Sequence, residues 1–371
     1  MVHETDSSHD RSRRAFIGTV GAAGMGLAAS TSVAASSDGD PTPIDSPTVI
    51  EEPGEYELVA DLSPDELEQS GCIVVDLRDE QGDVINHGDF TLHGNGHTVD
   101  LTETEFEPER SWQRLSGIVF NPGRRWDELP ETQWEMAVEG LEIRGGGSGI
   151  SSRLAGGGTF TDITLVDNGV GFDSYVDGGE FRNCVVAENG SGVVLGGDTE
   201  VWGGSGSVFE SCTIRSNEGP GIVVGPESQA QIETSRIVHN RNGILAAAQG
   251  SSTIIERSHI CYNEEYGVFG DAYPELVVDE SESWPAEEAR IRATDNYWGA
   301  ANGPSGLERR WSEQDTGYEY VEPDEPFTDP ETGRPADGDG DAISESLEAG
   351  VSNVYFDPFS EASLENVGAQ R

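Results

Sequence analysis

The chain has 371 residues, of which 70 are Asp or Glu and 21 are basic, giving a formal net charge of −49 at pH 7. These 21 residues are all Arg, with no Lys, and the acids are spread along the chain rather than gathered in a tail. This charge disfavours nucleic acid and anionic membranes as partners, and a diffuse acidic surface without Lys is typical of extreme halophiles. The 48 Gly residues indicate many turns and short strands.

Residues 1–35 are predicted to be an export signal. Residues 12–18 read SRRAFIG, which matches the twin-arginine motif; an apolar stretch follows over 15–29, and SVAA at 32–35 is a small-residue cleavage site. The apolar stretch is too short for a permanent membrane helix, so we expect a secreted or cell-surface protein with no membrane insertion after signal removal. Residues 36–50 are expected to be a flexible lead-in.

A short helix is predicted at residues 62–68, LSPDELE, at the start of the main domain (51–360). Ser63 is its expected N-cap, Pro64 lies in the first turn and Glu66 closes a capping box. Such a helix would cover the exposed end of a stack of strands.

A repeat runs through the middle of the chain. Five segments align without gaps, and each ends on Asn; these residues are Asn168, Asn189, Asn217, Asn240 and Asn263. A shorter sixth copy, RIRATDN, ends on Asn296. The repeat unit is about one coil of roughly 22 residues, with loops of varying length.

Three columns of the repeat have a regular character. Aliphatic residues stand three positions before each Asn, and small or medium residues, including Cys184 and Cys212, stand five before. The column eight before is Phe or Ile: Phe160, Phe181, Phe209, Ile232 and Ile255. Residues three and five positions before the Asn are two apart and so face the same side of one strand. The residue eight before is an odd number of positions away, which indicates a bend between two strands. An apolar pair after the Asn forms a third strand.

Three short strands per coil predict a parallel β-helix, in which stacking of coils supplies the core that one coil cannot bury. We expect the Asn residues to stack in one turn, because Asn tolerates left-handed backbone angles and can bond along the stack.

Three further segments carry a resemblance to a known group. Residues 295–306 (DNYWGAANGPSG), 340–344 with 354–359, and 94–100 (GNGHTVD) resemble the closing and first coils of right-handed β-helix repeat proteins of the pectin-lyase-like superfamily. The resemblance covers roughly residues 71–360 and implies an all-β, single-stranded, right-handed parallel β-helix. That superfamily holds lyases, hydrolases, epimerases, a copper-delivery family and binding proteins. Its polygalacturonase and alginate-epimerase motifs are missing, so no catalytic residue is carried over.

The resemblance places a cleft over the strand that ends at the Phe/Ile column. The expected outward column next to it is Thr161, Arg182, Glu210, Glu233, Glu256 and Ala289. Stacked glutamates repel one another unless a cation or high salt relieves them, so Glu210, Glu233 and Glu256 are candidate Ca²⁺ ligands and, with Arg182, weak catalytic candidates. The alternative is a solvated acidic face.

A second candidate site is basic. The next strand is expected to gather several cations on one face, suited to carboxylate or sulfate: Arg236, Arg257, His259, Arg290 and Arg292. The alternative is internal ion pairing with loop acids.

Long insertions are expected near 101–135, 271–287 and 308–336. Trp residues in or near the coil-joining loops could stack on sugar rings, or pin the loops instead: Trp112, Trp126, Trp202 and Trp284. His93 and His97, with His87 and Asp89, form a weaker candidate site for a transition metal such as copper.

These observations predict an exported monomer that binds acidic polysaccharide and is a candidate for cleaving it in a lyase-type reaction, with calcium as the one cofactor considered. Two alternatives remain open: a non-catalytic surface or matrix protein, and a copper-handling relative. Residues 361–371 are expected to form a C-terminal tail.

Overall fold

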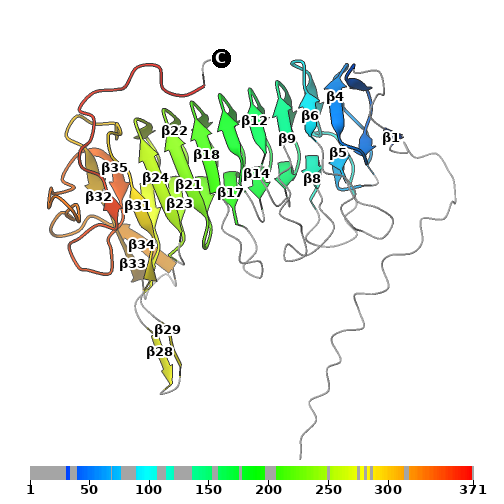
Figure 1. Cartoon of the computed structure of the whole chain (residues 1–371). Helices are drawn as coiled ribbons and strands as arrows, with labels where there is room; N and C mark the ends of the chain where they lie inside the picture. Colours follow the sequence, from blue (N-terminus) through cyan, green and yellow to red (C-terminus); the bar gives the residue numbers. More distant parts are fainter. Residues whose placement is uncertain are drawn as a thin grey trace, which may run out of the picture.

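The molecule is an elongated stack of β-strand coils (Figure 1). The computed structural model describes residues 31–33, 40–67, 69–76, 89–106, 114–120, 136–152, 158–174, 178–196, 206–248, 251–273, 276–279, 282–284, 287–312 and 317–369. Among them no helix has the length and apolar character needed to cross a membrane.

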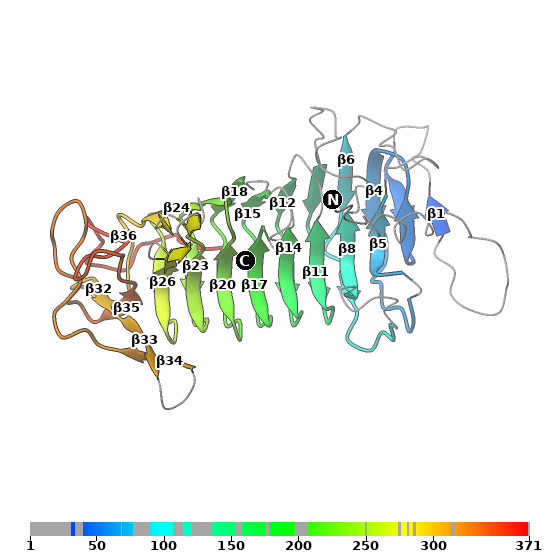
Figure 2. The same cartoon turned by 90° about the horizontal axis from the view of Figure 1, so that it is seen from below.

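Three long parallel sheets run along the axis, and each complete coil contributes one strand to each sheet in the order sheet 1, sheet 2, sheet 3 (Figure 2). Sheet 1 contains β2 (Thr42–Ile44), β4 (Gly54–Leu58), β6 (Phe90–His93), β9 (Met136–Glu139), β12 (Thr159–Thr161), β15 (Glu180–Arg182), β18 (Gly206–Glu210), β21 (Gln229–Glu233), β24 (Ser252–Glu256), β31 (Arg290–Arg292) and β36 (Val354–Tyr355). Sheet 2 contains β7 (Thr98–Asp100), β10 (Glu142–Arg144), β13 (Thr164–Val166), β16 (Val185–Ala187), β19 (Thr213–Arg215), β22 (Arg236–Val238) and β25 (His259–Cys261).

Sheet 3 follows the Asn turn. Its strands, in spatial order, are β1 (Thr31–Val33), β3 (Thr48–Ile50), β5 (Gly71–Val75), β8 (Ser116–Phe120), β11 (Ser148–Ser152), β14 (Val170–Ser174), β17 (Ser191–Leu195), β20 (Pro220–Val224), β23 (Asn242–Ala246), β26 (Tyr266–Gly270), β35 (Gly340–Ile343) and β32 (Pro304–Gly306). Three antiparallel hairpins project from the later coils: β27 (Ala272–Tyr273) with β30 (Glu287–Glu288), β28 (Leu276–Asp279) with β29 (Glu282–Trp284), and β33 (Glu308–Ser312) with β34 (Gly317–Val321).

The predicted core columns are confirmed. Phe160, Phe181 and Phe209 are register neighbours with ring centroids 5.0 and 4.8 Å apart and nearly parallel planes. The aliphatic column from Leu165 to Ile260 is in register through all five copies and buried. Burial of these columns, about 25 cal/mol per Å² of apolar surface, stabilises the stack.

The Asn residues form a continuous ladder, as predicted. In each step the backbone N–H and the side-chain Nδ2 of one Asn donate to Oδ1 of the next, as from Asn189 to Asn217 at 3.0 Å each. The ladder runs from Asn168 to Asn263, and Asp341 accepts at its end from Asn263 Nδ2 at 2.7 Å. Buried polar groups are thereby satisfied along the axis.

One part of the Asn prediction is wrong. The left-handed residue of the turn is the one before each Asn, with φ near 55–63°: Asp167, Glu188, Ser216, His239 and Tyr262. Asn is therefore required for its amide, which both donates and accepts, and not for its backbone angles.

The sixth copy is shifted relative to prediction. Asn296 does not follow Asn263 in the ladder; its Oδ1 instead accepts from Ser258 N at 2.8 Å, in the turn between sheets 1 and 2. That turn has its own column, in which Cys212 N donates to Ser235 Oγ and Ser235 N donates to Ser258 Oγ. Residues 290–296 are thus displaced by five positions from the expected alignment.

The predicted capping helix is also wrong. Residues 62–67 form isolated parallel bridges, Leu62 with Val99 and Glu66 with Glu105. Their backbone groups bond to the next coil, as from Leu62 N to Thr98 O at 2.8 Å, because pairing with a ready-made sheet edge competes with a single helical turn. The stack also begins earlier than expected, since β2 and β3 lie within residues 36–50.

The C-terminal tail lies along the outside of sheet 2 and returns toward the middle coils (Figure 1). Leu364 N donates to His259 Nε2 at 2.9 Å, Gly368 N to Thr234 O at 2.8 Å, and Ala369 N to Thr213 Oγ1 at 2.9 Å. The tail therefore covers part of the outer face of three consecutive coils.

Candidate functional site

The outer face of sheet 1 carries two columns of side chains, because alternate residues of each strand point away from the core. The first column is Glu55, Thr91, Ala137, Thr159, Glu180, Val208, Gln231, Ile254, Arg292 and Tyr355. The second column lies two residues further along each strand: Glu57, His93, Glu139, Thr161, Arg182, Glu210, Glu233 and Glu256.

A groove of about 870 Å³ runs beside the first column from Glu55 to Val208. It crosses six successive strands, β4 to β18, so at about 4.8 Å per strand its length is about 24 Å. Its other lining residues lie at the first position of these strands or just before them: Gly54, Asp89, Met136, Gly158, Gly178, Gly179 and Gly206.

Glycine shapes this groove, for two different reasons. A Cβ on Gly178 or Gly179 would meet backbone of the neighbouring coil within 2.8 Å, so these two positions are glycine because coils approach closely there. Gly206, in contrast, has nothing within 4 Å of a Cβ and faces open space. The lining ends at β18, and the register partners of Gly206 on the next two strands are Gln229 and Ser252.

The lining of the groove is acidic. It includes the carboxylates Glu55, Asp89 and Glu180, and none of its described lining residues is basic. Sequence reasoning missed Glu55 and Glu180, because it followed only the column next to the Asn repeat, and it named Asp89 only as part of a candidate metal site. The available signal was strand parity, since Glu180 stands two positions before Arg182 and faces the same side.

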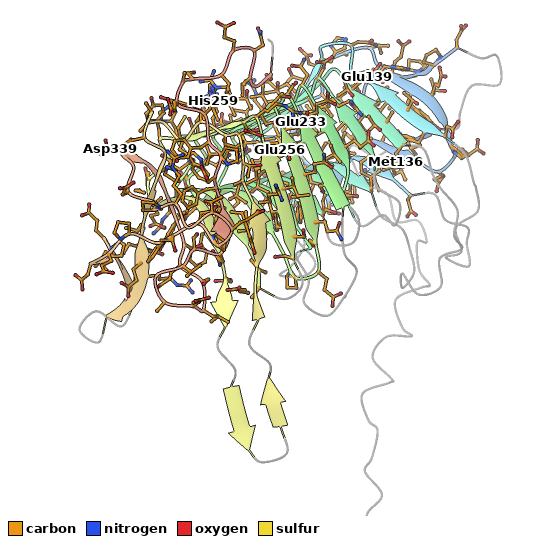
Figure 3. All side chains as sticks on the ribbon, turned by 60° about the vertical axis from the view of Figure 1, so that its left-hand side comes forward. Met136, Glu139, Glu233, Glu256, His259 and Asp339 are labelled. Atoms are coloured by element: carbon orange, nitrogen blue, oxygen red, sulfur yellow. The ribbon has the colours of Figure 1, made fainter. Side chains whose placement is uncertain are left out.

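The second column is a series of ion pairs, and its later members, Glu233 and Glu256, lie on neighbouring strands (Figure 3). His93 Nδ1 lies 2.6 Å from Glu139 Oε1. Arg182 pairs with Glu180 at 3.0 Å and also with Glu210, and Arg257 pairs with Glu233 and lies 3.9 Å from Glu256. The hydrogen bond that Arg182 donates to Glu180 and the nearby charge of Glu210 raise the pKa of Arg182.

The expected calcium site is not supported. The strand register confirms that Glu210, Glu233 and Glu256 stack. Their mutual repulsion is relieved by ion pairs with Arg182 and Arg257, and not by a metal ion. Among the described residues no group of three or more His, Cys, Asp or Glu is arranged to hold a metal ion. Ala289 does not extend the column, because it is buried and precedes β31.

The expected basic face is divided between two sheets. Arg236 and His259 are register partners in sheet 2, whereas Arg290 and Arg292 lie in β31 of sheet 1, because residues 290–296 are shifted by five positions. Arg257 lies in the turn between the sheets, with φ 50°. These residues therefore do not form one binding surface.

The C-terminal tail covers the sheet 2 half of that set. His259 is 7% exposed and accepts from Leu364 N, and the side chain of Arg236 lies against Gly368. Burial, and then the charge of Arg236, lower the pKa of His259, which keeps the ring neutral and its Nε2 able to accept.

The remaining candidates are only partly among the described residues. Trp112, Trp126, Trp202 and His87 lie outside the described residues, and Trp284 is in the β28–β29 hairpin, paired with Leu276. His93 and His97 each pair with a separate carboxylate, His97 with Asp61 at 3.0 Å. This pairing does not support a shared copper site.

Comparison with known proteins agrees with this architecture. Residues 116–283 match the family model described as right-handed beta helix region. The fold is a right-handed parallel β-helix.

No curated protein sequence matches the chain. Among solved structures, the A-module of mannuronan C-5 epimerase AlgE4 from Azotobacter vinelandii is similar, with 15% identity over 78% of this chain and 82% of that chain and a TM-score of 0.34. This low similarity carries no information about the substrate of the present β-helix.

Proposed function

We propose that this β-helix binds a linear glycan along the groove on sheet 1. The observation that carries the proposal is the groove itself, about 870 Å³ in volume and open along six strands that repeat at one coil spacing. The trough presents one outward side chain per coil at a regular spacing, although these side chains differ, and a regular spacing suits a polymer of similar units. Thr91, Thr159 and Glu180 offer hydroxyl and carboxylate groups to sugar hydroxyls.

The charge of the groove favours an uncharged glycan. Glu55, Asp89 and Glu180 would repel the carboxylates of a polyuronate, and the repulsion is weakened only by high salt or by a bridging cation. We therefore propose a glycan that is mostly neutral along the groove, in place of the acidic polysaccharide expected from the sequence.

Binding and cleavage of acidic polysaccharide is the second candidate function. One observation favours it: Arg292, in the first column beyond the groove, is exposed and makes no ion pair with any described residue. A lyase-type reaction would need a base close to the bound sugar. The candidate is His93, which lies on β6 with the groove residue Thr91 and contacts Glu139 on β9.

Blocking the groove tests the proposed function. Gly206→Trp and Ala137→Trp place a large side chain in the groove and should abolish binding in a panel of neutral and acidic linear glycans at high salt. Val166→Trp, on the outer side of sheet 2, is the matched control and should bind like the parent chain. Equal binding by all three variants would refute the groove as the site.

The same panel separates the chemical alternatives. Unsaturated products absorbing in the ultraviolet would establish elimination, and binding without products would establish a non-catalytic binding protein. Preference for polyuronates that chelators abolish would restore the acidic, calcium-dependent alternative and contradict the neutral one.

Export by the twin-arginine route and adaptation to high salt complete the proposal. The supports are the SRRAFIG motif and the net charge of −49, whose repulsion is screened over about 30 Å at 10 mM salt and about 3 Å at 1 M. β1 lies within the segment to be removed, so the exported chain would begin its stack at β2 and β3. A mature N-terminus upstream of residue 30, or a melting temperature that is equal at 10 mM and 2 M salt, would contradict these two points.

A further inference from the structure

The first column of sheet 1 continues past the end of the groove with a different chemical character. Beyond Val208 come Gln231, Ile254, Arg292 and Tyr355 in strict register. Ile254 is 39% exposed and Tyr355 37% exposed, although both lie on regular strands whose neighbouring residues, Ile255 and Val354, are fully buried. An isoleucine and a tyrosine therefore flank an arginine on an open sheet surface.

Arg292 is unusual among the arginines of this protein. On a chain with 70 acids and 21 basic residues, most described Arg side chains are ion-paired, including Arg144, Arg182, Arg215 and Arg257. Arg292 has no such partner among the described residues. Two residues further along, where the previous coils carry Glu233 and Glu256, this coil carries buried Thr294.

We propose that Ile254, Arg292 and Tyr355 form an anion-selective subsite for a carboxylate- or sulfate-bearing sugar at one end of the glycan track. The exposed Tyr355 ring stacks on a sugar face, and the guanidinium of Arg292 binds the anionic group through two parallel N–H donors. Ile254 supplies the apolar contact on the opposite side of Arg292. This proposal rests on the proposed glycan-binding function and names the ligand more closely.

The two parts of the track then select one class of ligand. The acidic groove from Glu55 to Val208 excludes a continuous polyanion, while the Arg292 subsite selects an acidic sugar about two to four strand spacings, or about 10–20 Å, beyond the groove's end. The ligand is therefore a sparsely charged linear glycan, neutral over most of its length with an isolated acidic residue, and not a polyuronate.

The test compares two probes that differ by one charge. A neutral linear gluco-oligosaccharide of about ten sugars and the same oligomer carrying one terminal glucuronate are titrated against the full chain by calorimetry at several salt concentrations. The parent chain should bind the charged probe about fivefold more tightly, with the preference falling as salt rises. Arg292→Gln should bind both probes equally, and Tyr355→Leu should weaken both.

Arg215→Gln is the matched control, because Arg215 is a half-exposed arginine on sheet 2 that pairs with Glu188. It should retain the preference of the parent chain. An Arg292→Gln variant that still prefers the charged probe overturns the subsite but leaves the groove proposal intact. If Gly206→Trp also binds both probes normally, the proposed function fails as well, so the two failures are distinguishable.

Discussion

The five asparagines of the turn and the three glutamates Glu210, Glu233 and Glu256 on sheet 1 both stack at one coil spacing, but the two stacks are stabilised in opposite ways. The Asn ladder between sheets 2 and 3 is buried from Asn168 to Asn240, and its amides donate to and accept from their neighbours. The glutamates on sheet 1 are partly exposed and separated by ion pairs with Arg182 and Arg257. An amide can bond to its own kind, whereas ionised carboxylates only accept, so their column depends on neighbouring cations.

A stacked column of polar residues indicates a ligand site only where its hydrogen bonds and charges are not already satisfied by neighbouring residues. The stacked glutamates predicted a metal site, because like charges at one coil spacing repel and need compensation. The structure shows that the arginines already compensate them. The sites proposed above lie in the less regular first column, where Gly206 faces open space and Arg292 has no described ion-pair partner.

The largest expected effect is from breaking the ladder. Asn217→Ala removes the acceptor for the backbone N–H and Nδ2 of Asn189, and the donor to Asn240 at 2.8 Å. Because buried unsatisfied groups cost about 1–3 kcal/mol each, we expect a loss of about 3–5 kcal/mol in the free energy of unfolding, measured by denaturant titration at fixed high salt. A loss below 1 kcal/mol would show that water or relaxation replaces these bonds.

The next effect concerns the carboxylate at the end of the ladder. Burial raises the pKa of Asp341 to about 6, against the lowering effect of hydrogen bonds from Asn263 and Tyr262. Because the pKa of Asp341 is higher in the folded protein, the protonated carboxyl favours folding. The contribution of Asp341 to stability is therefore fully present below about pH 4 and is lost as the pH rises through about 6. The stability difference between the parent chain and Asp341→Asn should therefore change by up to about 3 kcal/mol between pH 4 and 7. A constant difference over this range would contradict it.

A smaller effect is expected where the tail meets sheet 2. The pKa of His259 is lowered, so protonation opposes the folded state, and the contribution of this contact falls as the pH drops below about 6.5. The charged group that acts on His259 is Arg236 on β22. Protonated His259 cannot accept from Leu364 N. The protection of the amides of residues 360–369 against hydrogen exchange, relative to unstructured amides at the same pH, should therefore fall at acid pH.

His259→Gln tests the same contact without titration. Glutamine keeps an acceptor, so the tail of this variant should exchange at a rate that lacks the acid-dependent increase. His239→Gln, one coil away and stacked on Tyr262, is the control and should behave like the parent chain. Identical acid dependence in the parent and His259→Gln would assign the effect to other groups.

The smallest effect is expected from the glutamate column. Glu233→Gln removes one partly exposed ion pair with Arg257, so the free energy of unfolding should change by less than about 1 kcal/mol, and less at high salt. Glycan binding should be unchanged, because Glu233 does not line the groove. A loss of binding together with calcium dependence would return the metal-site hypothesis to consideration.

The sequence by itself determined the coil. The Phe stack, the aliphatic column and the Asn ladder all follow from residue spacing within one repeat, because strand parity and side-chain hydrogen bonding are local and recur at every coil. The same reasoning predicted that Glu210, Glu233 and Glu256 stack, and the register confirms it.

Only the tertiary structure decided which of these columns are available to a ligand. The five-residue displacement of 290–296 moves Arg292 to sheet 1, and the return of residues 360–369 covers Arg236 and His259. The repeat does not predict the displacement of residues 290–296, because it depends on the hydrogen bond between Ser258 and Asn296. Nor does it predict the position of the tail, which depends on a contact between His259 and Leu364, about 100 positions apart. Long-range packing of irregular segments, unlike the coil, has no period to reveal it.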